Sequence, residues 1–151
     1  MKLNEKTFEE FIAEWLVAHG GYDIVKVGTS APHSKDFDPV RCLDLVELFA
    51  FISATQTDEW EQLRKLHGGN EEGTRAKFSD RLAREIDHRG TVDVLRHGVV
   101  DLGVHIRLAY FKPAHGLTPL LRERYAANRL TVTRQLPFDA RRPRPWTCVY
   151  S

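Results

Sequence analysis

The sequence predicts an α/β domain whose N-terminal half is helical and whose C-terminal half supplies the strands. Up to about residue 90, hydrophobic side chains recur at the spacing of amphipathic helices, and glycines interrupt the runs. Further along, residues 104–111 and 130–136 are alternating or β-branched, which is typical of strands. The length of 151 residues is that of one ordinary domain.

Four helices are expected in the first half, each opened by a residue that can cap a helix. The expected starts are Thr7 (with Glu10 in capping-box spacing), Asp38 (with Pro39 in the first turn), Asp58 and Thr74. The expected stops are Gly20-Gly21, Gly68-Gly69 and Gly90. The hydrophobic stripe of the first helix is Phe8, Phe11, Ile12, Trp15 and Leu16. Residues 22–37 are expected to form a loop or one short strand.

The second half is expected to hold two strands joined by a helix. Residues 91–97 are ambiguous, and the strand over 104–111 is stopped by a Lys-Pro pair. A helix then begins at Thr118-Pro119 and ends near Asn128, and the second strand follows at 130–136. A strand, a helix and a strand in this order favour a parallel pair. Because a two-stranded sheet rarely stands alone, the sheet is expected to be incomplete.

The net charge of +1 conceals two halves of opposite sign. Residues 1–60 hold five basic and eleven acidic residues, a net charge of −6, whereas residues 61–151 hold 17 basic and 10 acidic residues, a net charge of +7. Such asymmetry is a hint of a polyanionic partner for the basic half. The other interpretation is that the arginines lie on solvated helix faces.

Composition excludes several classes of protein. No hydrophobic run approaches the ~20 residues of a membrane span, and the first five residues do not open a signal peptide. Two cysteines, Cys42 and Cys148, are too few for a disulfide scaffold or a zinc site. A cytoplasmic protein is therefore expected.

The residues by themselves show no complete active site. The seven histidines lack metal-ligand spacing and are expected at the surface or at helix ends, and no glycine-rich phosphate loop or nucleophile elbow occurs. Glu9, Glu10 and Glu14 could place a carboxylate over a metal ion, or form an exposed acidic face. Four cations on or beside the strand segments could neutralise DNA phosphates, or form surface ion pairs. They are Arg96, Lys112, Arg129 and Arg134.

Three stretches carry a resemblance to a known family. The first is Asp38-Pro39 through Phe51-Ile52-Ser53-Ala54-Thr55-Gln56 to Trp60-Glu61-Gln62-Leu63, the second runs from Arg89-Gly90-Thr91 to Arg96-His97-Gly98, and the third from Leu108-Ala109-Tyr110-Phe111-Lys112-Pro113 to Tyr125-Ala126-Ala127-Asn128-Arg129 and Leu136. In this order they resemble the N-terminal region of the restriction (R) subunit of type I restriction–modification enzymes. The resemblance covers residues 1–138, and residues 139–151 form a divergent tail rich in arginine and proline.

This resemblance implies a nuclease domain of the PD-(D/E)xK superfamily, with the helical half packed on a restriction-endonuclease-like sheet. In the full-length family an ATP-driven translocase follows, DNA is the substrate, and modification and specificity subunits are partners. Carboxylates hold Mg²⁺, which polarises the phosphate and activates water. Glu9 matches the family's supporting helix-borne glutamate.

The sequence departs from the family after Phe138. The family continues with a strand of the type Leu-Asp-Leu-Val-Leu-Phe, whose Asp binds Mg²⁺, and then a Glu-x-Lys pair; neither follows here. The domain is therefore expected to be truncated, with an incomplete sheet. In a reading frame shifted by two bases, the last base of the Trp146 codon and the first two bases of the Thr147 codon must encode Asp. The neighbouring codons allow the sequence Leu-Asp-Leu-Cys-Leu-Phe, which is close to the missing strand. This predicts a frameshift in the gene, which the nucleotide sequence would test.

Without these ligands the isolated chain is expected to be catalytically inactive and to hold no cofactor of its own. Mg²⁺ and ATP are expected only for the full-length family. The alternative is a non-catalytic DNA-binding or subunit-interaction module, and a third possibility is a relic that folds poorly because a sheet edge is unpaired.

Overall fold

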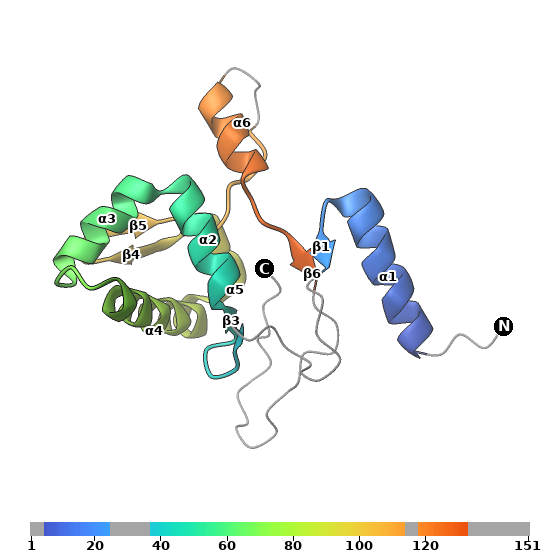
Figure 1. Ribbon diagram of the computed structural model, residues 1–151, viewed down its shortest axis with the longest axis horizontal. Coiled ribbons are helices and arrows are strands. Elements are labelled where there is room, and N and C mark those ends of the chain that lie inside the picture. The colour runs from blue at the N-terminus through green and yellow to red at the C-terminus, as the bar shows by residue number, and fades with distance from the viewer. Residues whose placement is uncertain (1–4, 25–36, 114–117, 133–151) are drawn as a thin grey trace.

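The computed structural model describes residues 5–24, 37–113 and 118–132 of the chain (Figure 1). Within these ranges the fold is mixed, with six helices and three two-stranded sheets. The helices are α1 (Glu5–Gly20), α2 (Leu45–Thr55), α3 (Thr57–Leu66), α4 (Glu71–Arg89), α5 (Thr91–His97) and α6 (Pro119–Ala126). The strands are β1 (Asp23–Ile24), β2 (Phe37–Asp38), β3 (Leu43–Asp44), β4 (Val99–Asp101), β5 (Val104–Ile106) and β6 (Thr131–Val132).

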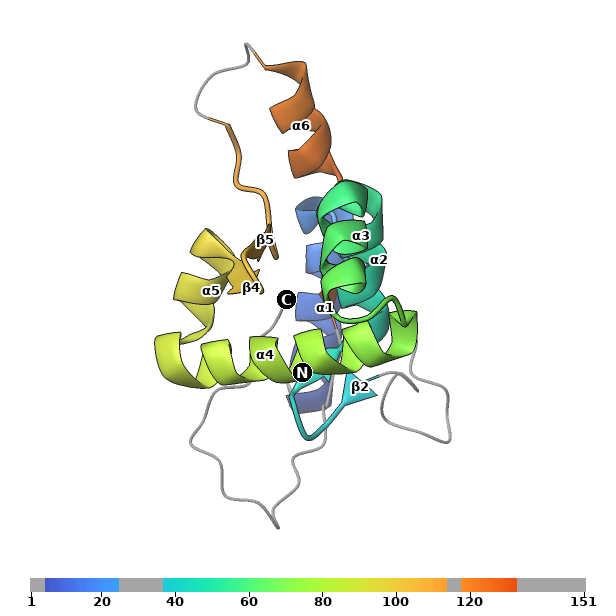
Figure 2. The same cartoon turned by 90° about the vertical axis from the view of Figure 1, so that its left-hand side faces the viewer.

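The hydrophobic core lies among α2, α3, α4, α5 and the antiparallel hairpin β4–β5, which together we call the helical body (Figures 1 and 2). Phe78 of α4 is fully buried and meets the Trp60 ring of α3 edge to face, at 5.7 Å between ring centroids. Such aromatic pairs add attraction beyond the area they bury. The buried core side chains are Phe49, Phe51, Ile52, Trp60, Leu63, Phe78, Leu82, Val94, Val99, Val104, Ile106 and Tyr110.

The predicted helices are present, but the predicted first residue is wrong for three of them. α1 begins at Glu5, two residues before the expected cap. α4 begins at Glu71 because the Asn70 side chain accepts hydrogen bonds from the backbone N–H groups of Glu72 and Gly73. Thr74, the expected start, is buried one turn inside the helix, where its hydroxyl donates to the Asn70 carbonyl at 2.7 Å.

The largest error concerns Asp38, because α2 begins only at Leu45. The Asp38 carboxylate instead organises a tight turn between β2 and β3, accepting from the backbone N–H of Val40 at 2.8 Å and of Arg41 at 3.1 Å. The Arg41 guanidinium pairs with Asp38 and also reaches Asp80 of α4, with Nη2 and Oδ1 2.7 Å apart. Asp38, which the sequence predicts as a helix cap, thus stabilises a turn. In a helix cap and in a turn alike, the aspartate carboxylate accepts hydrogen bonds from nearby backbone N–H groups.

This turn predicts a pH-dependent effect of Asp38→Asn. Burial raises the pKa of Asp38, but hydrogen bonds from the Arg41 side chain and from the turn outweigh it, so the net pKa is lowered. A lowered folded pKa contributes stability above the unfolded value of about 3.9, and this is lost as the pH falls through the folded value. We expect Asp38→Asn to cost about 1 kcal/mol at pH 7, and the difference from wild type to shrink below about pH 4.

Urea unfolding between pH 7 and pH 3 measures the difference. Glu72→Gln, at an exposed carboxylate on α4, controls for the change in net charge. A difference that stays constant over this pH range would contradict a charge-dependent role for Asp38.

The expected parallel pairing of residues 104–111 with 130–136 is wrong. Residues 104–106 form β5, which pairs antiparallel with β4, and residues 107–113 are not regular strand. The turn between β4 and β5 places Leu102 and Gly103 at φ values of 47° and 83°, as a two-residue hairpin turn requires. The described part of the second strand, β6, pairs in parallel with β1 instead, and residues 133–136 lie outside the described residues.

Two helices leave the hydrophobic side chains of their stripes exposed. On α1, Ala13 is only 3% exposed, but the predicted stripe points outward, with Phe11 63% and Trp15 52% exposed. α6 has no buried residue and projects from the rest of the protein (Figure 1). α1 lies beside the β1–β6 pair, whereas α6 stands above α2, away from that pair (Figure 1).

Candidate functional site

Two of the three sequence blocks described above, blocks one and three, contact each other directly. The Phe51 and Tyr110 rings lie 5.9 Å apart between centroids, and Glu47 forms an ion pair with Arg129. Gln56, which ends the first part of block one, is 3% exposed and lies against the chain just after β5. Its amide accepts from the Arg107 backbone N–H at 2.6 Å and donates to the Arg107 carbonyl at 2.9 Å. A primary amide is the side chain that can satisfy a donor and an acceptor of one residue together. Gln56 therefore fixes Arg107, the residue just before block three, against the α2–α3 junction.

Asn128 makes the same kind of contact within block three. Its side chain accepts from the Tyr110 N–H at 2.9 Å and donates to the Tyr110 carbonyl at 2.6 Å. The Arg124 guanidinium lies over the Tyr110 ring, 5.5 Å from its centroid. These contacts hold the segment after α6 against the segment before it.

Block two begins with Arg89, the last residue of α4, whose side chain contacts the rest of the block. Its guanidinium donates to Glu85, to Asp93 and to the Gly98 carbonyl, the last at 3.0 Å. The hydrogen bonds that the Arg89 guanidinium donates to Glu85 and Asp93 raise the pKa of Arg89 above its already high usual value. Arg89 thus joins the end of α4 to both ends of α5, and its contacts mainly position the backbone of block two.

The expected DNA-contacting cations come from separate elements. Arg96 is exposed on α5 and Lys112 is exposed after β5. Arg129 is held in an ion pair, its Nη2 3.0 Å from Glu47 Oε1, and this pairing raises the pKa of Arg129. Arg134 and the 139–151 tail lie outside the described residues. Among the described residues no hydrogen bond or ion pair links these predicted cations to one another.

The expected supporting glutamate, Glu9, lies on α1 and is half-buried. It is one turn before Ala13, so it shares the inward side of the helix and not the exposed aromatic stripe. Glu14, by contrast, is exposed. Across residues 5–24, 37–113 and 118–132, no group of three or more histidine, cysteine or carboxylate side chains gathers in a way that could hold a metal ion.

One sequence in the chain, Leu43-Asp44-Leu45, has the letters expected of the metal-binding strand. There Asp44 is the N-cap of α2, with its Oδ1 3.1 Å from the backbone N of both Val46 and Glu47. The segment turns from a two-residue strand into a helix at this point, so Asp44 serves as a cap in this structure.

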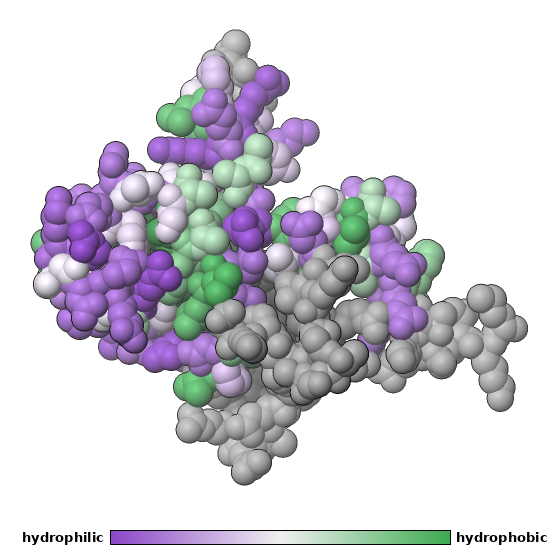
Figure 3. All heavy atoms as spheres, viewed as in Figure 1, coloured by the Kyte–Doolittle hydropathy of each residue, from purple (hydrophilic) through white to green (hydrophobic). Residues whose placement is uncertain are grey.

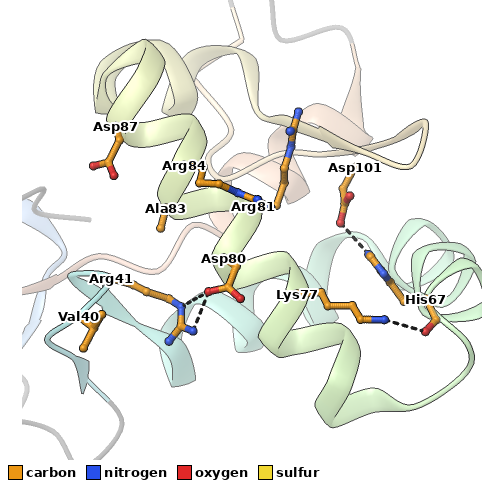
Figure 4. A pocket seen from close by; sticks show the side chains of 10 residues that line it. All are labelled: Val40, Arg41, His67, Lys77, Asp80, Arg81, Ala83, Arg84, Asp87 and Asp101. Atoms are coloured by element: carbon orange, nitrogen blue, oxygen red, sulfur yellow. Dashed lines mark hydrogen bonds and ion pairs between the residues drawn. The ribbon is translucent and has the colours of Figure 1, made fainter.

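A hollow of about 460 Å³ lies along α4, between the Asp38 turn and the β4–β5 hairpin (Figure 4). Three cations of α4 line it at helical spacing: Lys77, Arg81 and Arg84. The Nε of Arg81 is buried without a hydrogen-bond partner, although the same guanidinium pairs with Glu85 at 2.8 Å. The signal for this cluster in the sequence is the spacing of the three cations by four and three residues.

At one end of the hollow, His67 and Asp101 form a nearly buried pair. Nε2 of His67 and Oδ2 of Asp101 are 2.8 Å apart, and each side chain is 11% exposed. The expectation of a helix-end role holds for His67, which is the C-cap of α3. Because Asp80, Asp87 and Asp101 also line the hollow, its charges nearly balance, and it is a weaker anion site than its arginines suggest.

The positive charge of the second half is concentrated toward its end. Residues 61–106 hold eight basic and eight acidic residues, a net charge of zero, so the whole +7 lies in residues 107–151, with nine basic and two acidic residues. The described part of this segment, 107–113 and 118–132, contains α6, and we call it the α6 arm. It carries five basic residues and one acidic residue: Arg107, Lys112, Arg122, Arg124, Arg129 and Glu123.

Comparisons of the chain with protein-family models, curated proteins and solved structures find no match. In the described part of the chain, none of the helices combines the length and the apolar character needed to cross a membrane.

Proposed function

We propose that this chain is the N-terminal, nuclease-side region of a type I restriction subunit, acting on DNA in the cytoplasm together with modification and specificity subunits. The observation that supports the proposal is the packing of blocks one and three against each other. Phe51 of block one contacts Tyr110 of block three, Glu47 pairs with Arg129, and Asn128 joins the two ends of block three through Tyr110. The residues that carry the resemblance thus include those whose contacts stabilise the backbone conformation of the described residues.

The nuclease part would be built on α1, β1 and β6. These elements lie side by side (Figure 1), and the backbone N–H of Asp23 donates to the Leu130 carbonyl at 2.8 Å. In the proposed domain the β1–β6 pair is the start of a restriction-endonuclease-like sheet, and inward-facing Glu9 is the supporting carboxylate beside it. ATP would act on the translocase of the full-length family.

The described residues do not make a Mg²⁺ site. Glu9 contributes one carboxylate, no cluster of three or more ligands surrounds it in those ranges, and Asp44 is engaged as a helix cap. The 151 residues also contain no Glu-x-Lys sequence. We therefore propose that on its own the chain does not cleave DNA.

The second candidate is a non-catalytic DNA-binding or subunit-interaction module. The observation that favours it is the α6 arm, whose net charge is +4 while the other described residues, 5–24 and 37–106, sum to −8, with 10 basic and 18 acidic residues. Of the cations predicted to contact DNA, Arg96 and Lys112 are exposed and form no ion pair within the described residues.

Purified chain tested against duplex DNA checks both proposals. We expect binding whose logarithm falls linearly with the logarithm of salt concentration, by about 0.9 per phosphate contacted, and no cleavage with Mg²⁺. Lys112→Ala and Arg96→Ala should each reduce that slope by about one. Lys65→Ala, at an exposed lysine paired with Glu61, is the matched control.

Failure to bind DNA at low salt would contradict the DNA-directed proposals. Mg²⁺-dependent cleavage that Glu9→Ala abolishes would contradict the proposed inactivity and place a complete nuclease site in the chain.

A further inference from the structure

The outward face of α1 is a continuous hydrophobic surface that nothing in the described residues covers. Phe8 is 56% exposed, Phe11 63%, Ile12 42% and Trp15 52%. His19 extends the stripe by one turn, stacked on Trp15 at 5.1 Å between ring centroids. Figure 3 shows hydrophobic side chains reaching the surface over this helix. A contiguous patch of this kind on a protein surface marks an interaction site.

The α6 arm carries a second such surface. Phe111 is 60% exposed, Leu120 53%, Leu121 44% and Tyr125 43%. Leu121 and Tyr125 are four residues apart and therefore lie on one face of α6. Since α6 buries no residue at all, little packing within one copy of the chain holds this face.

The two surfaces have opposite charge. Residues 5–24 hold five acidic and one basic residue, a net charge of −4, against +4 for the α6 arm. On α1, exposed Glu14 lies one turn after Phe11, beside the aromatic stripe. On α6, Arg122 follows Leu121 and lies three residues before Tyr125; its side chain is exposed and makes no hydrogen bond or ion pair within the described residues. Each hydrophobic face is therefore flanked by a charge that complements the other.

We propose that two copies of the chain associate through these surfaces, with α1 of each copy docked on the α6 arm of the other and Glu14 paired with Arg122. Within one copy α1 lies beside the β1–β6 pair and α6 stands apart from it above α2 (Figure 1), so the two helices do not meet. A two-fold axis makes both contacts at once and leaves neither surface open, as closed dimers do.

The size of the surfaces fits a stable dimer. Four half-exposed large side chains offer about 400 Å² on each of the two surfaces, at about 200 Å² for a whole large side chain, within the 150–250 Å² that an aromatic side chain buries. Two such contacts bury roughly 1,600 Å², the usual size of a specific protein interface. A second copy is favoured over DNA as the occupant of the hydrophobic face of the arm, because exposed leucines gain little from a phosphate backbone, whereas they gain from burial against aromatic rings.

Charge reversal across the interface tests the proposal. Wild type is expected to be dimeric by sedimentation equilibrium, and Glu14→Arg or Arg122→Glu alone should raise the dissociation constant at least about tenfold, because like charges then face each other at both contacts. Mixing the two variants, or combining both changes in one chain, should restore the dimer, since each contact regains an opposite pair. Both positions are exposed, so circular dichroism should show an unchanged fold.

Arg96→Glu, at an exposed arginine of α5, is the matched control and should leave the dissociation constant unchanged. Tyr125→Ser should weaken the dimer as the single reversals do. A monomeric wild type would overturn the proposal, and so would a dimer that neither reversal weakens. A monomer that binds DNA through Arg122 would overturn it in favour of a nucleic-acid surface on the arm.

Discussion

Replacing Gly98 by alanine is expected to destabilise the protein by about 3–5 kcal/mol, a large part of the 5–15 kcal/mol that a domain usually has. Gly98 ends α5 at φ 71° and ψ −168°, a backbone conformation that is almost confined to glycine. A Cβ atom there would collide with the Ile106 carbonyl oxygen and lie 3.2 Å from the Arg107 Cα. Because these are backbone atoms of β5 and the chain after it, they have no rotamer by which to move away.

Gly90 is the matched control for this prediction. It has a similar conformation, φ 80° and ψ 153°, but a Cβ there meets nothing within 4 Å. Gly90→Ala should therefore cost only the conformational part, about 1–3 kcal/mol. Urea unfolding of both variants measures the difference, and equal losses would show that close packing at Gly98 contributes nothing.

Gln56→Leu is expected to cost about 2–3 kcal/mol, because it leaves the Arg107 N–H and carbonyl without their partner. Gln62→Leu, at an exposed position of α3, controls for the change of residue type and should be nearly neutral. The measurement is again the free energy of unfolding in urea.

Gln56→Glu separates hydrogen bonding from packing. An ionised glutamate still accepts from the Arg107 N–H, but it sets an oxygen against the Arg107 carbonyl. Burial and that carbonyl raise the pKa of this carboxyl in the folded state. The stability missing at neutral pH should then return as the pH falls and the protonated group donates to the carbonyl. A deficit that does not change with pH would indicate that the amide matters only for packing.

Much of the helical body could be predicted from local sequence alone. The spacing of Phe78 and Leu82, and the glycine at position 90, place α4 correctly, because helix formation depends on neighbours along the chain. The starts were less predictable. Asp38 and Asn70 both offer a short polar side chain to nearby N–H groups, and the sequence does not state whether a turn or a helix receives it.

The sheets and the site were harder to predict for a different reason. The β4–β5 hairpin was missed because Leu102 occupies a turn position that usually holds Asn, Asp or Gly. Gln56 and Asn128 gave no signal because their partners are backbone groups, which every residue carries. Strand pairing between β1 and β6 joins segments far apart in the chain, where spacing carries no information.

The parallel pair that joins residues 23 and 131 also bears on the order of folding. Its formation closes a loop of more than a hundred residues around the helical body, and loop-closure entropy makes such contacts late and slow. The helical body has mostly short-range contacts and its own core, so it can fold first as a unit. The β1–β6 pair would then exchange its amide hydrogens with solvent sooner than the core does. The strands proposed to start the nuclease sheet are thus the last to order and the first to open.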